Sequence, residues 1–235
     1  MAAIQSLIAE AARAGTSALL VWSLLVGCSG RTTPLTTGEP PASPPALRYV
    51  IEDRVPPDRL REVKAAVDRA WSVLARLFPV RPRPLTVRVY RTRARFVADL
   101  RRHGFTAQSA RFFATSGAPR PLAGQFYIPP DLDRAAICHE LTHAFSDATW
   151  GTAYRRAKWL DEGIATYFAV KHCGGVLPAP TEEPALAEMT TEAQWHRLRG
   201  PLRPAAYRRA AFAVWLLGKR WGDARLVAAI TDLRT

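Results

Sequence analysis

The sequence has few cysteines, few lysines and few acidic residues, and each shortage narrows the class of protein. Three cysteines among 235 residues form neither a zinc ribbon nor a disulfide framework. The 33 Lys and Arg residues outnumber the 20 Asp and Glu residues, and the net charge of +13 comes almost wholly from arginine. These arginines are spread thinly, so we expect no specific nucleic-acid partner. The densest basic stretch is Arg81 to Arg102, and apolar residues alternate with polar ones within it. This pattern favours a half-buried strand whose basic residues face solvent. The alternative is a surface that binds lipid headgroups or an acidic substrate.

An apolar run near the start of the chain is too short to cross a membrane. Gly15 to Gly27 covers about thirteen residues, which suits the core of a signal peptide, whereas a spanning helix needs about twenty. The run ends in Leu-Val-Gly-Cys and resembles the lipobox of bacterial lipoproteins, although Glu10 beside a single Arg13 departs from the usual positive start. We expect residues 1–28 to be a lipoprotein-type signal segment. Cys28 would then carry the lipid that anchors the exported protein in the cell envelope, at the outer membrane or periplasmic face.

The rest of the chain divides into a tether and one folded domain. Residues 29–46 are rich in Pro, Thr and Ser without apolar periodicity, which is typical of a linker. Residues 47–235 are long enough for a single catalytic domain. Periodicity and capping signals in this domain predict strands at 48–52, 85–90 and 125–128 and helices at 57–77, 93–102, 134–146, 159–168 and 207–221, and leave 105–121 unassigned.

The segment His139-Glu-Leu-Thr-His143 carries the strongest functional signal. Residues four apart share a helix face, so both imidazoles can bind one Zn²⁺ while Glu140 lies over the open coordination position. This is the HExxH pattern of zinc peptidases, in which the glutamate activates the attacking water. Catalytic zinc needs a third protein ligand, and we expect Glu162, in a second helical segment eighteen residues further on, to supply it. Three other histidines are expected to be surface residues: His103, His172 and His196.

The string Trp159-Leu-Asp-Glu-Gly-Ile-Ala-Thr-Tyr167 and its distance from HExxH resemble the aminopeptidase N branch of gluzincins, and more closely the short bacterial peptidases of the peptidase MA family. The resemblance covers roughly residues 85–226. It implies a zincin-like α+β fold: a small mixed sheet packed on the zinc-binding helix, followed by a mostly helical C-terminal part. It also implies that Tyr207, at the start of a later helix, donates to the oxyanion, with Tyr167 as the alternative.

Two departures from that family refine the expected function. The glycine-rich exopeptidase motif is replaced by Ala123 to Tyr127, which favours an endopeptidase acting on peptide or protein substrates. Ala169 stands where a carboxylate usually supports a ligand histidine, so Asp161 and Thr166 are the candidates for that support.

Three further expectations concern the substrate, the cysteines and the alternatives. The strand of Gln125, Phe126 and Tyr127 is expected to be the sheet edge that pairs with substrate. Cys138 and Cys173 are expected to be unpaired, because Cys173 lies eleven residues beyond Glu162, about 16 Å along a helix. The alternatives are an inactive zincin-fold binding module and a basic surface-binding protein with an accidental motif. The oligomeric state is left open.

Overall fold

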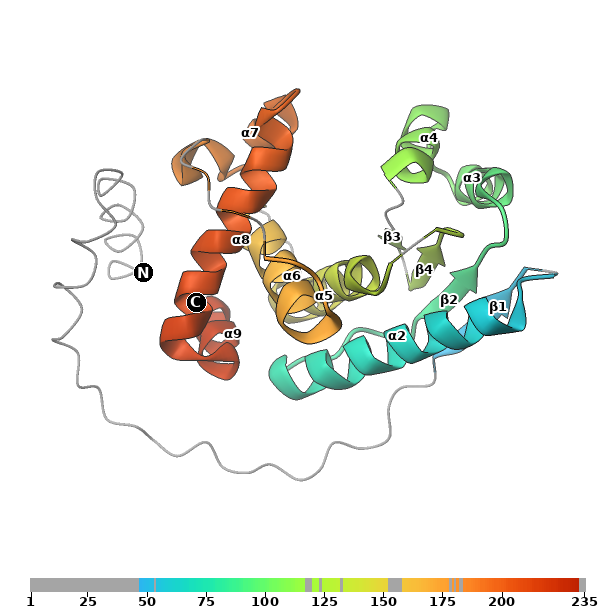
Figure 1. The fold of residues 1–235 in the computed structure, drawn as a ribbon, viewed down its shortest axis with the longest axis horizontal. Helices are drawn as coiled ribbons and strands as arrows, with labels where there is room; N and C mark the ends of the chain where they lie inside the picture. The colour runs from blue at the N-terminus through green and yellow to red at the C-terminus, as the bar shows by residue number, and fades with distance from the viewer. Residues whose placement is uncertain are drawn as a thin grey trace, which may run out of the picture.

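The structure is a computed structural model that describes residues 47–52, 54–116, 120–122, 124–131, 133–151, 158–177, 179, 181 and 184–232. The expected signal segment, the tether and Cys28 lie outside these residues. Among the described helices, none is both long and apolar enough to cross a membrane. Figure 1 shows a small sheet on one side of the molecule and a group of helices on the other.

The sheet has four short strands in the order β1-β2-β4-β3. Strands β1 (Arg48–Ile51), β2 (Thr86–Val89) and β4 (Gln125–Ile128) are parallel, and β3 (Arg120–Leu122) is antiparallel to β4. The sheet is therefore small and mixed, as predicted.

The prediction that Gln125, Phe126 and Tyr127 form a free sheet edge is wrong. Strand β4 is paired with β2 on one side and with β3 on the other. Its side chains are also covered, because Phe126 and Tyr127 are both 0% exposed and point to opposite faces of the sheet. The edge on this side is β3, which comes mostly from the stretch that sequence patterns left unassigned.

Helices cover both faces of the sheet. On one face α2 (Pro57–Leu77) and α5 (Arg134–Trp150) share a core with the strands. The predicted apolar stripe of α2 is buried at Val63, Val67, Trp71 and Leu74. On the other face α3 (Arg93–Arg102) and α4 (Ala107–Ser116) enclose a smaller core around Tyr127.

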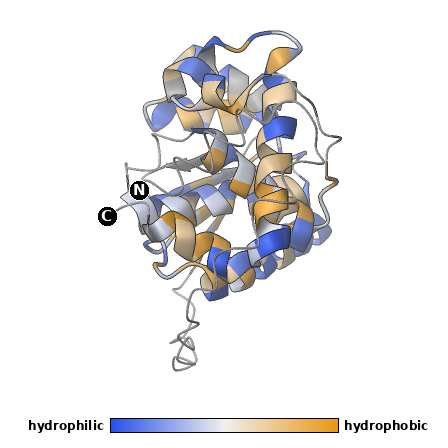
Figure 2. Ribbon diagram, turned by 90° about the vertical axis from the view of Figure 1, so that its left-hand side faces the viewer, coloured by the Kyte–Doolittle hydropathy of each residue, from blue (hydrophilic) through white to orange (hydrophobic). Residues whose placement is uncertain are grey.

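The C-terminal part is helical, as predicted. It comprises α6 (Lys158–Cys173), the 3-10 helix η3 (Leu186–Met189), α7 (Glu192–Arg197), α8 (Leu202–Trp221) and α9 (Asp223–Asp232). Figure 2 shows that the helices of the molecule carry both hydrophobic and hydrophilic residues, as expected of helices with one buried face. Helix α8 begins five residues earlier than predicted, so Tyr207 lies in its second turn rather than at its start.

Candidate metal centre

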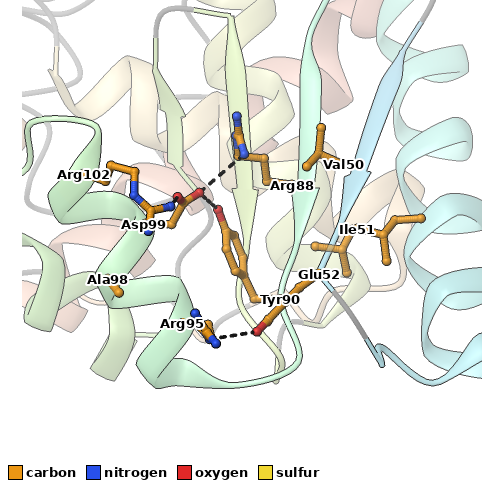
Figure 3. Close-up of a pocket in the computed structure, with 10 residues that line it drawn as sticks. Val50, Ile51, Glu52, Arg88, Tyr90, Arg95, Ala98, Asp99 and Arg102 are labelled. Atoms are coloured by element: carbon orange, nitrogen blue, oxygen red, sulfur yellow. Dashed lines mark hydrogen bonds and ion pairs between the residues drawn. The ribbon is translucent and has the colours of Figure 1, made fainter.

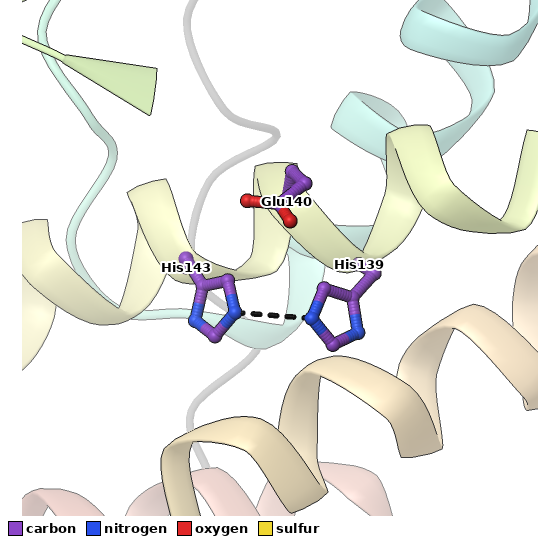
Figure 4. Close-up of side chains that lie close together, drawn as sticks. All are labelled: His139, Glu140 and His143. Atoms are coloured by element: carbon purple, nitrogen blue, oxygen red, sulfur yellow. Dashed lines mark hydrogen bonds between the residues drawn. The ribbon is translucent and has the colours of Figure 1, made fainter. Parts of the chain in front are cut away.

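Helix α5 presents His139 and His143 on one side. Its start is fixed by Asp133, whose side chain accepts a hydrogen bond from the Ala136 backbone N–H at 2.5 Å. The helix continues without Gly or Pro to Trp150, four residues beyond the predicted end. Figure 4 shows the two imidazole rings projecting side by side from this helix, with Glu140 close by.

Three potential ligand atoms from two helices form a nearly equilateral triangle. His139 Nε2 lies 3.1 Å from His143 Nε2. Glu162 Oε2, from α6, lies 3.4 Å from the first nitrogen and 3.5 Å from the second. Ligands bound tetrahedrally at about 2.0 to 2.1 Å from zinc are separated by about 3.3 Å, so the triangle has the size that a zinc ion requires.

The chemistry of these donors also fits zinc. Two imidazoles and one carboxylate form a common catalytic ligand set, which leaves a fourth position for water or substrate. Glu140 is close enough to take part, because its carboxylate and both imidazoles offer atoms within 4.8 Å of one another. Glu162 is 6% exposed, and a carboxylate so deeply buried needs compensating charge.

Both histidines have a polar partner at the ring nitrogen that points away from the triangle. Asp161 Oδ1 lies 2.7 Å from His143 Nδ1, and Thr166 Oγ1 lies 3.4 Å from His139 Nδ1. Thr166 also donates to the Glu162 carbonyl at 2.9 Å, which fixes its hydroxyl. The two residues predicted to support the histidines therefore lie in the required places, and they would orient the Nε2 atoms towards a metal.

Sequence reasoning missed Lys158, the first residue of α6. Its Nζ lies 2.8 Å from Glu162 Oε1 and 2.9 Å from Asp161 Oδ2. The other carboxylate oxygen of Glu162 thus remains for the triangle. The signal that could have identified Lys158 is its spacing, because residues three and four apart on a helix are neighbours.

Electrostatics couple the members of this site. Burial alone would lower the pKa of His143, but the carboxylates of Asp161 and Glu162 outweigh it and hold that pKa well above its usual value. Burial alone would raise the pKa of Glu162, but His143, His139 and Lys158 together hold it well below its usual value. The buried positive and negative charges therefore stabilise one another.

Tyr207 reaches the same site from α8. Its ring centroid lies 6.5 Å from that of His139 and 5.0 Å from that of Trp195. Burial and the negative charge of Glu162 raise the pKa of Tyr207 to about 12, so its hydroxyl keeps its proton. The alternative, Tyr167, is used elsewhere, since its hydroxyl donates to Asp223 Oδ1 at 2.6 Å.

Two of the other histidines have partners away from this site. His103 Nδ1 lies 2.8 Å from the Asp99 carbonyl, and His172 Nε2 lies 3.0 Å from Asp223 Oδ2. The side chain of His196 lies outside the described part of the chain. His103 is exposed, as predicted, whereas His172 is only partly exposed. Neither belongs to a group of described residues that could hold a metal ion.

The expectation that Cys138 and Cys173 are unpaired is wrong, because they form a disulfide with a Cα–Cα distance of 6.3 Å. Helices α5 and α6 run antiparallel: His143 meets Asp161 at the start of α6, His139 meets Thr166 further along, and Cys138 meets the last residue. The distance from Glu162 to Cys173 along α6 was therefore no obstacle. The bridge joins the two helices that supply the triangle.

A separate cavity of about 350 Å³ lies at the ends of β1 and β2 beside α3 (Figure 3). Its charged residues pair with one another. Asp99 accepts from Tyr90 and Arg102 and lies 3.6 Å from Arg88, while Glu52 lies 3.5 Å from Arg95. This network ties α3 to the sheet, and none of the residues that line the cavity lies on α5 or α6.

Comparisons with protein-family models, with curated proteins and with solved structures found no match for this chain. The chemistry of the site is therefore the basis for assigning a function to this chain.

Proposed function

We propose that this chain is a zinc-dependent endopeptidase with a zincin-like fold. The observation that carries the proposal is the triangle of His139 Nε2, His143 Nε2 and Glu162 Oε2, with sides of 3.1 to 3.5 Å. Further support comes from Glu140 beside this triangle and from the polar partner at each histidine's other nitrogen. The resemblance of both motifs to gluzincins points to the same reaction.

Each residue has a distinct part in the proposed hydrolysis. A zinc ion held by His139, His143 and Glu162 would polarise the peptide carbonyl and acidify a water molecule. Glu140 accepts the proton of the attacking water and passes it to the leaving amine. The protonated hydroxyl of Tyr207 donates a hydrogen bond to the carbonyl oxygen as negative charge develops there.

We propose that this peptidase is exported and held at the cell envelope by a lipid on Cys28, and the disulfide supports the export. Disulfides persist in the bacterial periplasm and at cell surfaces, whereas cytosolic thiols are kept reduced. A bridge between Cys138 and Cys173 therefore fits an exported protein.

The decisive test combines metal analysis with a hydrolysis assay. After dialysis, mass spectrometry should find one zinc per chain, and the protein should cleave casein or a quenched peptide until a chelator is added. Zinc without hydrolysis of any member of a peptide library would favour the alternative, a binding module on a zincin fold. A chain that binds no zinc would refute the proposed centre.

The first prediction separates Glu140 from Glu162. Glu140→Gln keeps the size of the side chain but cannot accept a proton, so hydrolysis should collapse while one zinc per chain remains. Glu162→Ala should instead lose zinc, because two histidines form an incomplete site, and should melt at a lower temperature than the zinc-bound wild type. Full zinc in Glu162→Ala would show that the third ligand is misassigned. Activity in Glu140→Gln would remove the proposed base.

A further inference from the structure

A cavity of about 670 Å³ adjoins the candidate metal centre on the side of His139. Two of its lining residues, Thr166 and Tyr207, contact or approach that histidine: Thr166 Oγ1 is 3.4 Å from His139 Nδ1, and the Tyr207 ring centroid is 6.5 Å from the His139 ring. Asp161, which contacts His143, and Lys158, which contacts Glu162, do not line this cavity. The cavity is therefore placed to receive a group on one side of the bond that is cleaved.

The described residues that line this cavity include several basic side chains. Three of its eight lining residues are arginines, Arg199, Arg203 and Arg208, and none of the eight is acidic. Arg203 lies one helical turn before Tyr207 on α8, so the two side chains share a face. The guanidinium of Arg203 is close enough to Tyr207 that its charge lowers the pKa of the phenol against the larger effect of burial.

We propose that this cavity binds a carboxylate of the peptide substrate and that Arg203 determines this specificity. The inference rests on the proposed function, because it names the substrate class of the same site. A guanidinium matches a carboxylate through two parallel N–H···O bonds, and partial burial strengthens this pairing relative to the exposed surface. Arg203 is the best placed of the three, since it is partly buried and lies on the same helix face as the proposed oxyanion donor.

Two kinds of carboxylate could fill the cavity, an Asp or Glu side chain near the cleaved bond or the carboxylate at the end of the peptide. The test uses two series of quenched peptides to separate them. In the first, a neutral peptide with an amidated C-terminus carries one Glu in place of Gln at successive positions. In the second series the peptide has no acidic side chain but ends in a free carboxylate. The number of residues between this carboxylate and the cleaved bond increases from one peptide to the next.

We expect one Glu position, or one free C-terminus, to raise kcat/KM about tenfold to hundredfold over its neutral counterpart, the range of a hydrogen-bonded charge pair. Arg203→Gln should abolish most of this gain, so that the preferred acidic peptide is cleaved little better than its neutral counterpart. Arg225→Gln is the matched control, because it removes the same charge from an exposed position on α9. Zinc content and melting temperature establish that both variants are folded.

A binding measurement makes the result independent of turnover. In the Glu140→Gln background, fluorescence anisotropy should show about tenfold tighter binding of the preferred acidic peptide than of its Gln counterpart, and Arg203→Gln should remove the difference. Equal binding of the two peptides would overturn the inference, because the cavity would then have no preference for a carboxylate. An equal gain from Glu at every position, or an equal loss in Arg225→Gln, would also overturn it, because the net charge of the protein would then explain the preference.

The two proposals can fail separately. Equal hydrolysis of acidic and neutral peptides by a zinc-loaded wild type would overturn only the carboxylate site. A chain that holds no zinc and cleaves nothing would refute the proposed peptidase, while the binding measurement would still decide whether the cavity selects carboxylates.

Discussion

The ammonium group of Lys158 lies between two buried carboxylates, 2.9 Å from Asp161 Oδ2 and 2.8 Å from Glu162 Oε1. Only 17% of its side chain is exposed, compared with 1% and 8% for the carboxylates. Because separated buried charges are costly, this cation stabilises the two carboxylates before any metal is considered. A bound zinc ion would add a second positive charge next to the same glutamate. Lys158 and a bound zinc ion would therefore act partly as alternatives in neutralising the site.

This competition predicts the behaviour of Lys158→Met. In chelator the variant should unfold with about 3 kcal/mol less stability than wild type, because two buried carboxylates lose their common partner. Addition of zinc should raise its melting temperature more than it raises that of wild type, because the metal then supplies the missing charge. Thermal unfolding with chelator and with zinc measures both effects, and Lys219→Met, an exposed lysine, is the control. A variant that no longer binds zinc would mean that Lys158 chiefly orients Glu162.

Tyr207→Phe tests the proposed oxyanion donor. A hydrogen bond made only in the transition state affects turnover rather than binding, so kcat should fall on the order of 10² to 10³ while zinc content and KM stay nearly constant. Tyr49→Phe is the control, because it removes a hydroxyl that lies near Asp68, remote from the site. An unchanged kcat would show that Tyr207 only packs against Trp195.

Helices α6 and α8 approach each other closely at Gly163, the residue after the proposed ligand Glu162. A Cβ atom at this position would lie 2.6 Å from the Ala210 carbonyl oxygen and 2.7 Å from Val214 Cγ2. The carbonyl belongs to the backbone of α8 and cannot move without the helix. Gly163 therefore sets the distance between the helix of Glu162 and the helix of Tyr207.

Gly163→Ala should displace α8 from α6. We expect a loss of about 1 to 3 kcal/mol in stability, as in other overpacked cores, and a lower kcat because Tyr207 moves with α8. Zinc content should remain near one per chain, since α5 and the Glu162 backbone are not in the clash. Chemical denaturation and steady-state kinetics measure the two effects. If kcat is unaffected, the position of α8 has no part in the reaction.

Elements with strong local signals were predicted from the sequence almost to the residue. The bounds of α2, α3 and β4 were correct, because Pro57 at a first helical turn, Thr92 as an N-cap and the apolar periodicity all act locally. The two histidines of the candidate metal centre could be predicted for the same reason, since His139 and His143 lie on one helix. Glu162 was found only through its motif, because its approach to them depends on how two helices pack.

Two of the missed features depend on contacts between distant parts of the chain. The position of β4 inside the sheet requires β3, whose short Arg-Pro-Leu sequence lacks alternation. The disulfide requires the antiparallel packing of α5 on α6. The earlier start of α8 at Leu202 was obscured by prolines at 201 and 204, which are tolerated in a first helical turn.

The net charge of +13 affects how strongly the whole molecule is attracted to a membrane surface. A protein this basic is attracted to anionic lipid headgroups even without an anchor, and salt screens this attraction between exposed charges. Attachment by a lipid depends on buried hydrocarbon and resists salt. The two modes can therefore be separated by the ionic strength of a wash.

Cys28→Ala tests the lipid anchor proposed for the residue that follows the apolar run. At low salt the variant can remain on membranes through its arginines, but a wash at about 1 M salt, where the screening length is about 3 Å, should release it. Wild type should stay bound through the same wash, because a lipid on Cys28 together with acylation gives stable anchoring. Fractionation followed by immunoblotting measures this, and a larger, uncleaved precursor should accumulate in the variant. Arg225→Gln, which changes an exposed residue of the folded domain and leaves both Cys28 and the disulfide intact, is the control and should stay on the membrane. A Cys28→Ala protein that remains bound after the high-salt wash would refute the anchor and would assign membrane attachment to another part of the chain.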